Sequence, residues 1–380
     1  MMRVLHAVMT LDPGGVERWL LEITRRLDPA VIRFDFAVAT GEGGAYAEEL
    51  SRLGSRIFFL RAGRDPFRLA LRLRRVLREA GPYDAVHAHL HHVGGIVLAV
   101  AERAAIPLRI AHSHLDTSPI DRRGGPLRRL YRTSTRKMID RHATHRIAVS
   151  AIAARSLYGP DWEQDPRVRI LPCGLDFERF RALPSPDVPR RRLGLPLDAL
   201  VFGTVGRLEE QKNHLFLLDV FALLRERRPE ARLVLVGHGS FEARLRRRAA
   251  ELGLGETVLF TGARSDVPEI LAAMDVFLFP SLFEGLGLAP IEAQAAGLPC
   301  LLSEAVPAEV RVFPERTRVL PLDARLWADE ALSLLDLPRL SPEAAVARIE
   351  ESPFAMRRHL RDLLSIYGVA SPDPIPRRAA

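Results

Sequence analysis

Cysteine and long apolar runs are scarce in this 380-residue chain, and each scarcity excludes a class of protein. Two cysteines, Cys173 and Cys300, are too few for the disulfide framework of a small secreted protein. The longest candidate for a membrane span, 93–101, is far shorter than the roughly 20 residues needed. The first apolar run, 3–9, is soon followed by acidic residues, which predicts a buried strand rather than an export signal. We therefore expect a cytoplasmic protein.

Lysine is almost absent, because Lys137 and Lys212 stand against 53 arginines. The net charge of +8 is uneven: residues 1–185 hold 30 basic and 20 acidic residues (net +10), and residues 186–380 hold 25 and 27 (net −2). The basic excess of the first half predicts contact with a polyanion or an anionic membrane surface. Few aromatic residues lie among the arginines, which argues against nucleic-acid binding.

Short apolar runs alternate with amphipathic stretches in both halves of the chain, which predicts an α/β protein with two Rossmann-like, doubly wound parallel sheets. The predicted strands are 3–9, 33–39, 56–60, 84–88, 108–112, 146–149, 200–205, 232–237, 257–260, 276–279 and 299–302. The predicted helices are 16–27, 45–53, 66–80, 93–104, 126–141, 150–158, 213–226, 240–252, 267–273, 288–296, 324–336 and 354–367. A proline-rich hinge divides the chain into domains 1–185 and 186–350. Residues 351–380 supply a helix that crosses back to the first domain, and a tail.

Three glycine-containing loops each follow a predicted strand and open a helix. The first holds Gly14 and Gly15, a turn where backbone can approach an anion. It lacks the G-x-G-x-x-G pattern of dinucleotide-binding proteins.

The second loop runs from Gly206 to Asn213, and its Arg207 and Lys212 could converge on a pair of phosphates. Asn213 stands at the expected helix N-cap. A solvated surface loop with two cations is the alternative interpretation.

The third loop carries Glu284, Gly285 and Gly287, and it leads into a helix that begins near Leu288 and contains Glu292. Paired carboxylates can accept hydrogen bonds from sugar or ribose hydroxyls. Apolar neighbours make the helix appear buried, and a buried glutamate needs partners.

Together these three loops resemble the family 4 retaining glycosyltransferases. That family has the GT-B architecture, two Rossmann-like domains that face a cleft. The resemblance covers nearly the whole chain and is densest from about 200 to 302. His238 stands where the family commonly has Asp, and Cys173 replaces the Asn of an Asn-Gly-Val-Asp turn.

The resemblance implies roles for these residues. Arg207 and Lys212 would bind the donor diphosphate, Glu284 the transferred sugar, and Glu292 the ribose. Backbone near Gly287 and Leu288 would bind phosphate. The other glycines of the donor site would be Gly15, Gly206 and Gly285. A histidine at a strand end would contact the donor sugar; His112 is favoured and His114 is the competitor.

No metal site is predicted. The run 87–92 holds four histidines, but carboxylate or cysteine partners are not apparent in the sequence. The chain also lacks the Asp-x-Asp pair with which GT-A enzymes hold a divalent ion. Two side-chain cations could replace that ion, and we expect no cofactor.

The predicted helix 126–141 combines basic residues with an apolar face of Leu127, Leu130, Tyr131, Met138 and Ile139. This pattern is typical of a helix that lies on anionic lipid. An ordinary surface helix packed through that face is the alternative.

We therefore expect a cytoplasmic, metal-independent, retaining hexosyltransferase, peripheral to the membrane. A UDP-sugar or a GDP-sugar would be the donor and a lipid-linked or free sugar the acceptor, in exopolysaccharide or cell-envelope assembly. A non-hydrolysing sugar-nucleotide epimerase of the same architecture and a non-catalytic two-domain binding protein are the alternatives.

Overall fold

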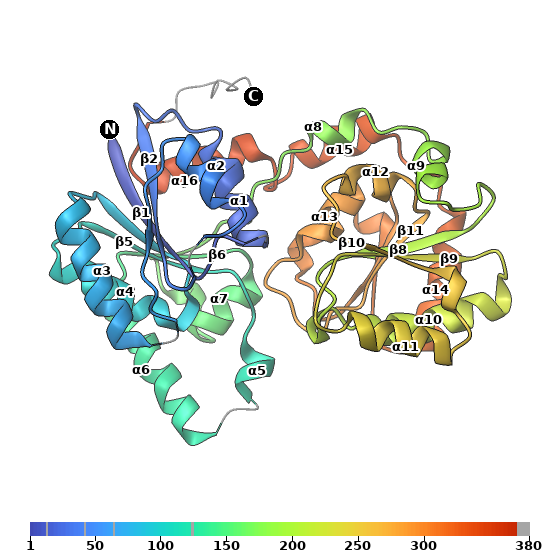
Figure 1. Cartoon of the computed structure of the whole chain (residues 1–380), viewed down its shortest axis with the longest axis horizontal. Coiled ribbons are helices and arrows are strands. Elements are labelled where there is room, and N and C mark those ends of the chain that lie inside the picture. Colours follow the sequence, from blue (N-terminus) through green and yellow to red (C-terminus); the bar gives the residue numbers. More distant parts are fainter. Residues whose placement is uncertain (13, 42, 64, 123–124, 371–380) are drawn as a thin grey trace. The chain divides into compact units, whose positions relative to one another are not determined.

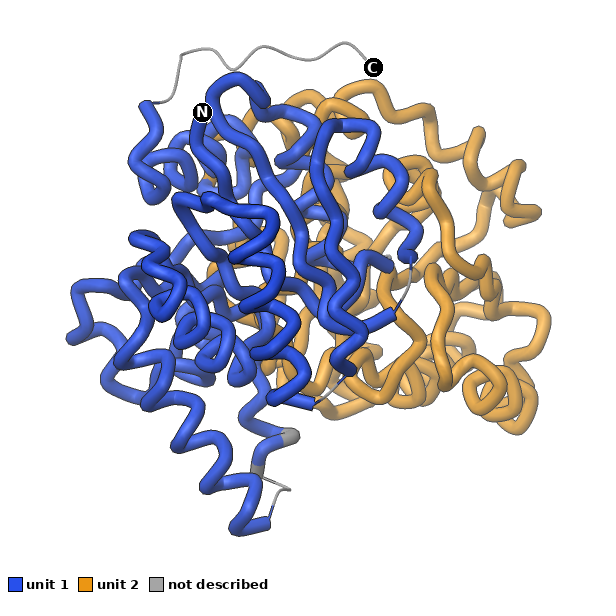
Figure 2. The backbone as a smooth tube through the Cα atoms, turned by 60° about the vertical axis from the view of Figure 1, so that its left-hand side comes forward, with its two compact units in different colours: residues 1–175, 353–380 blue, residues 176–352 orange. Residues whose placement is uncertain are grey.

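The chain forms two compact units in a computed structural model that describes residues 1–12, 14–41, 43–63, 65–122 and 125–370 (Figures 1 and 2). Unit 1 comprises Met1–Leu175 and Pro353–Ala380, and unit 2 comprises Asp176–Ser352. Each unit contains one parallel sheet covered by helices. No helix in the described ranges is long and apolar enough to cross a membrane.

Unit 1 has a seven-stranded sheet in the order β3-β2-β1-β4-β5-β6-β7. Its strands are β1 (Met2–Val8), β2 (Ile32–Val38), β3 (Ile57–Phe59), β4 (Ala85–Ala88), β5 (Leu108–Ser113), β6 (His145–Ala148) and β7 (Val168–Ile170). The central strands are buried along most of their length, as expected for a parallel sheet covered on both faces. In this register His6 of β1 lies opposite His87 of β4.

The helices of unit 1 include three that pack in sequence, α3 on α4 and α4 on α6. The helices are α1 (Gly15–Thr24), α2 (Ala47–Arg52), α3 (Pro66–Ala80), α4 (Gly94–Arg103), α5 (Ser118–Arg122), α6 (Pro126–His142), α7 (Ala151–Tyr158) and α16 (Met356–Ile366). Gly95 allows the α4–α6 contact, because a Cβ there would lie 2.7 Å from the Thr135 carbonyl oxygen.

Unit 2 has a six-stranded sheet in the order β10-β9-β8-β11-β12-β13. Its strands are β8 (Val201–Val205), β9 (Arg232–Val236), β10 (Val258–Gly262), β11 (Val276–Phe279), β12 (Cys300–Ser303) and β13 (Thr317–Leu320). The helices are α8 (Glu178–Arg181), α9 (Asp187–Arg192), α10 (His214–Arg227), α11 (Glu242–Glu251), α12 (Val267–Ala272), α13 (Leu288–Ala295), α14 (Ala324–Ser333) and α15 (Pro342–Glu350). Phe202, Phe221 and Trp327 lie in a core that these strands share with α10 and α14.

The first segment of unit 1 ends at Leu175, ten residues before the predicted boundary at 185, and the chain returns to unit 1 through α16. The Leu175 amide donates to the Phe354 carbonyl at 2.8 Å. His359 of α16 is buried and contacts the Pro172 carbonyl through Nδ1 at 2.7 Å. Gly174 makes room for it, because a Cβ there would lie 2.5 Å from the His359 Cβ. These contacts hold residues 172–175, which precede the linker, against α16 and the residues before it.

Candidate active site

In unit 2 the loops after β8 and β9 contact each other through their backbones. The Gly206 amide donates to the Val236 carbonyl at 2.9 Å, and the Leu208 amide to the His238 carbonyl at 2.9 Å. Gly237 has φ +137°, and a Cβ there would lie 2.0 Å from the Gly206 oxygen. These glycines let the loop that carries Arg207 and Lys212 fold tightly against its neighbour.

Lys212 lies in a 3₁₀ turn, Glu210–Lys212, and its ammonium forms an ion pair with Glu284 from the loop after β11. Lys212 Nζ lies 2.5 Å from Glu284 Oε1 and 4.5 Å from the centroid of the Phe279 ring. The exposed fractions of the two side chains are 15% and 6%. A charge pair shielded in this way is stronger than one on the surface, because water screens it less.

Two further hydrogen bonds, one from a side chain and one between backbones, join the same two loops. Gln211 Nε2 donates to the Phe283 carbonyl at 2.8 Å, and the Leu282 amide donates to the Gln211 carbonyl at 2.8 Å. The loops are neighbours because β8 and β11 pair in parallel, so their carboxyl ends share one edge of the sheet. The structure thus brings Lys212 and Glu284 together across 72 residues of sequence.

The remaining predicted donor-site residues of unit 2 lie on or beside these loops. Gly287, at φ +88°, is the N-cap of α13 and is followed by Leu288 at the first helical position. Glu292 is buried on α13, as the apolar neighbours predicted. Gly285 belongs to the turn before the helix. The contacts of these residues with a donor stay predictions.

Two details of the second loop were not predicted from the sequence. Arg207 is exposed and Lys212 is paired with Glu284; their convergence on a pair of phosphates stays a prediction. Asn213 occupies the N-cap of α10 but adopts a left-handed conformation, φ 54° and ψ 39°, and its side chain makes no capping hydrogen bond. Asn213 is at once the C-cap of the 3₁₀ turn and the residue before α10, so it separates the two helical segments.

His214, the first residue of α10, is buried, and burial followed by the nearby Lys212 charge lowers its pKa to about 4. The unfolded chain, with a histidine pKa near 6.5, therefore binds the proton more readily. Above pH 6.5 the neutral His214 leaves the free energy of unfolding undiminished. As the pH falls from 6.5 toward 4, protonation of this histidine in the unfolded chain lowers the free energy of unfolding.

Between pH 7.5 and pH 5 the unchanged protein should lose about 2 kcal/mol more unfolding free energy than the His214→Leu variant. The variant lacks the imidazole that is protonated on unfolding. Urea unfolding at the two pH values measures this difference. The same pH dependence in both proteins would show that His214 is protonated equally in the folded and unfolded states.

In unit 1, histidines gather at the carboxyl ends of β1, β4 and β5. His6 Nδ1 lies 3.0 Å from His89 Nε2, and His89 Nδ1 lies 2.8 Å from His114 Nε2. His87 lies 3.1 Å from His112 and 2.6 Å from the Tyr367 hydroxyl. Burial lowers the pKa of all five imidazoles, that of His114 to about 3. They are neutral at pH 7.

The histidines of the run 87–92 alone suggested no metal site, whereas the folded cluster also contains His6, His112 and His114 from or beside two other strands. The signal that could have revealed it is a histidine at or near the end of each of three predicted strands. His112 is buried and His114 is half-buried, so His114 is the more accessible of the two candidates for the donor sugar. That contact stays a prediction, as does the approach of Gly15, which begins α1, to the diphosphate.

The helix predicted at 126–141 is present as α6, but its apolar face is divided. Ile139 is buried beside Gly95 of α4, whereas Leu127 and Leu130 are 83% and 64% exposed. Tyr131 is exposed to 41%. The amino-terminal part of α6 projects from unit 1 in both views (Figures 1 and 2). Within the apolar face of α6, the exposed side chains therefore lie in this amino-terminal part. Arg123 and Gly124, which precede the helix, lie outside the described residues.

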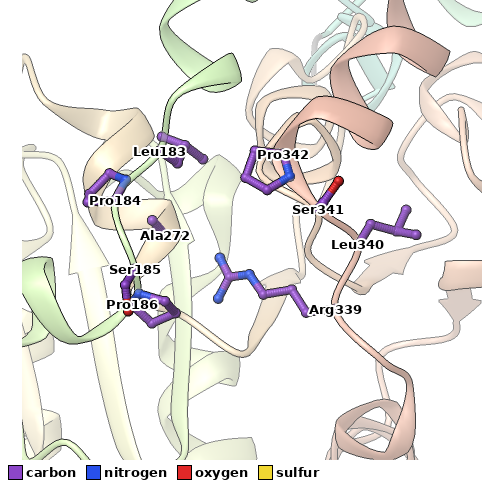
Figure 3. Close-up of a pocket in the computed structure, with 9 residues that line it drawn as sticks. All are labelled: Leu183, Pro184, Ser185, Pro186, Ala272, Arg339, Leu340, Ser341 and Pro342. Atoms are coloured by element: carbon purple, nitrogen blue, oxygen red, sulfur yellow. The ribbon is translucent and has the colours of Figure 1, made fainter.

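A separate pocket lies in unit 2 between the linker and the segment before α15 (Figure 3). The guanidinium of Arg339 points across it and donates to the Met274 carbonyl at 2.9 Å. Its lining shares no residue with the loops described above; it comprises Leu183, Pro184, Ser185, Pro186, Ala272, Arg339, Leu340, Ser341 and Pro342. Arg339 therefore serves packing here rather than the candidate site.

Residues 13–179 match the model of Glycosyltransferase Family 4, and residues 187–331 match that of Glycosyl transferases group 1. The chain is 32% identical over 374 residues to the Bacillus subtilis protein EpsF, named as a glycosyltransferase, with 97% of each chain covered. It is also 32% identical over 233 residues, 58% of each chain, to the Escherichia coli UDP-Gal:alpha-D-GlcNAc-diphosphoundecaprenol alpha-1,3-galactosyltransferase.

Among solved structures, the Anabaena HepE protein in complex with UDP and glucose matches with a TM-score of 0.80 at 20% identity, covering 97% of this chain and 100% of that one. This likeness concerns the fold, two parallel-sheet α/β units of the GT-B type. Because family models match both halves and EpsF is similar over 97% of its length, the chain belongs to the family 4 glycosyltransferases.

Proposed function

We propose that the chain transfers a hexosyl group from a UDP-sugar to a lipid-linked acceptor, with retention of anomeric configuration and without a metal ion, in exopolysaccharide or cell-envelope assembly. The observation that carries this proposal is the shielded Lys212–Glu284 pair beside the start of α13. The pair offers a cation for a phosphate and a carboxylate for a sugar hydroxyl within one small site.

Donor binding changes the partners of this pair. A diphosphate oxygen takes Lys212 Nζ as its partner and leaves Glu284 free to accept a hydrogen bond from the sugar. Arg207 adds a second cation, and amide N–H groups at the start of α13, near Gly287 and Leu288, face the same anion. Glu292 accepts hydrogen bonds from the ribose hydroxyls.

The reaction then breaks the bond between the anomeric carbon and the diphosphate oxygen, and the electron pair leaves with the diphosphate. The acceptor oxygen attacks the same face of the sugar, and its proton passes to the departing phosphate oxygen. Once the donor is bound, Lys212 and Arg207 stabilise the growing negative charge on the diphosphate, which lowers the barrier. Retention follows from attack on the face that the leaving group vacates.

The choice of donor and acceptor draws support from similar proteins. The E. coli relative is named for a UDP-galactose donor and a diphosphoundecaprenol-linked acceptor, and HepE was solved with UDP.

Thermal shift with UDP-, GDP- and ADP-sugars tests the donor, because a ligand that binds the native state raises the melting temperature. We expect stabilisation by a UDP-sugar that is lost in the Lys212→Ala variant and kept in Lys137→Ala. Stabilisation by GDP- or ADP-sugars alone would assign a different base.

The lipid-linked acceptor places the chain at an anionic membrane, and the projecting part of α6 has the required chemistry. Leu127 and Leu130 are exposed beside Arg129, which faces solvent, and beside Arg128, which is half-exposed and pairs with Asp121 at 3.3 Å. Apolar side chains that insert between lipids and arginines that attract anionic head groups act together at such a surface.

We expect the protein to float with phosphatidylglycerol vesicles at low salt and to be released by high salt, because salt screens the attraction. The Leu127→Glu/Leu130→Glu variant should stay in solution, whereas Leu326→Glu, which changes an exposed leucine of unit 2, should still float. Equal binding to neutral and anionic vesicles, or none to either, contradicts the electrostatic part of the proposal.

A further inference from the structure

The histidine cluster of unit 1 contains two overlapping sets of three side chains close enough to hold a metal ion, one of His6, His87 and His89 and one of His89, His112 and His114. His89, His112 and His114 each offer a ring nitrogen, and these three nitrogens lie within 4.8 Å of one another. Two of the rings, those of His112 and His114, have centroids 3.9 Å apart. In the described part of the chain, His112 Nε2 is buried with no hydrogen-bond partner. A buried polar atom left without a partner calls for an explanation.

One arrangement of the hydrogen bonds around these rings leaves His112 Nε2 and His89 Nδ1 as acceptors, and His114 Nε2 becomes one when its proton moves to Nδ1. A neutral imidazole donates through one nitrogen and accepts through the other. If His87 donates to the Tyr367 hydroxyl through Nδ1, its Nε2 accepts from His112 Nδ1, and His112 Nε2 carries a lone pair. If His89 donates to His6 through Nε2, its Nδ1 accepts from His114 Nε2, and entry of the ion replaces this hydrogen bond once the His114 proton has moved to Nδ1.

In this arrangement the cluster also holds the outer partners that metal sites use. A metal-bound histidine almost always donates its second ring N–H to another group, which fixes the ring and its tautomer. His6 is that group for His89 and lies 3.0 Å away, and His87 is that group for His112 and lies 3.1 Å away. Tyr367, on the return to unit 1 after α16, orients His87 in turn.

We propose that His89, His112 and His114 bind one Zn²⁺-type transition-metal cation, with the fourth position open to water or to an oxygen of a ligand. Imidazole nitrogens suit zinc, cobalt and nickel rather than magnesium or calcium. Zinc–nitrogen distances of about 2.0–2.1 Å at a tetrahedral centre put the ligand nitrogens roughly 3.3 Å apart. The 2.8 Å contact between His89 and His114 therefore widens by about half an ångström when the ion enters.

This inference is independent of the proposed phosphate site, because all its ligands belong to unit 1, whereas Lys212 and Glu284 belong to unit 2. The cation is not assigned to the diphosphate. The metal site and the phosphate site can each be disproved without affecting the other, because cobalt absorption is measured without sugar transfer.

Titration of the EDTA-treated and desalted full chain with Co²⁺ tests the site, because four-coordinate cobalt absorbs strongly in the visible range. We expect one cobalt per chain and loss of the absorption when Zn²⁺ displaces it. The His89→Gln/His114→Gln variant should lose the absorption, and His6→Gln should bind cobalt about tenfold more weakly. His142→Gln, which changes a histidine paired with Glu102 outside the cluster, should bind as the unchanged protein does.

The unchanged protein gives the decisive result, so the proposal can be disproved even if a variant fails to fold. Absence of visible absorption in the unchanged chain overturns it. So does absorption that survives in a folded His89→Gln/His114→Gln variant, or in His114→Gln alone, since either would place the ion elsewhere.

Discussion

Replacement of Lys212 by arginine is expected to lower kcat/KM for sugar transfer by at least about 100-fold, or roughly 2.7 kcal/mol of transition-state stabilisation. The side chain reaches Glu284 through a narrow space. Its ammonium lies 4.5 Å from the centroid of the Phe279 ring, and its Cε would lie 3.3 Å from a Cβ placed on Gly206. A planar guanidinium is wider than an ammonium and needs a different set of partners.

Lys137→Arg is the matched control, because it makes the same substitution at the only other lysine of the chain, on the exposed surface of α6. Its kcat and KM should equal those of the unchanged protein. Steady-state kinetics of both variants decide the matter. If Lys212→Arg keeps full kcat and KM, the site accepts any cation and the argument from its width is wrong.

Gly237→Ala is expected to destabilise unit 2 by at least about 3 kcal/mol, or to prevent its folding. The new Cβ would lie 2.0 Å from the backbone oxygen of Gly206, and φ at this position is +137°. Neither strain can be relieved by moving a flexible side chain, because both involve the backbone.

Gly255→Ala serves as the control, since a Cβ there has nothing within 4 Å. Denaturant unfolding of the two variants should show a large loss of stability for the first and little change for the second. Equal stability of Gly237→Ala and the unchanged protein would mean that the loops after β8 and β9 are not held as closely as described.

The elements that the sequence predicted are those with strong apolar continuity. The central strands are buried along most of their length, so their residues are mainly apolar. The two strands that were missed, β7 and β13, lie at the edges of their sheets. Arg169 and Arg318 interrupt their short apolar patterns, and an edge strand tolerates such charges because one side is open to solvent.

The sequence predicted the loops of the candidate site one by one. It did not predict the contact between the loop after β8 and the loop after β11. Lys212 and Glu284 were each assigned to a donor, but their ion pair depends on β8 and β11 being neighbours, which the strand order β10-β9-β8-β11-β12-β13 decides. Strand order is a property of the whole sheet, and alternation of strands and helices does not determine it. The histidine cluster was missed for the same reason, since it needs β1, β4 and β5 side by side.

The most direct test of the central claim is sugar transfer from a UDP-sugar to a lipid-linked acceptor by the purified full chain in excess EDTA. The account assigns the phosphate charge to Lys212 and Arg207, so product should form at the same rate with and without the chelator. Complete loss of transfer in EDTA, with rescue by Mn²⁺ or Mg²⁺, would contradict it and would assign the diphosphate to a metal ion.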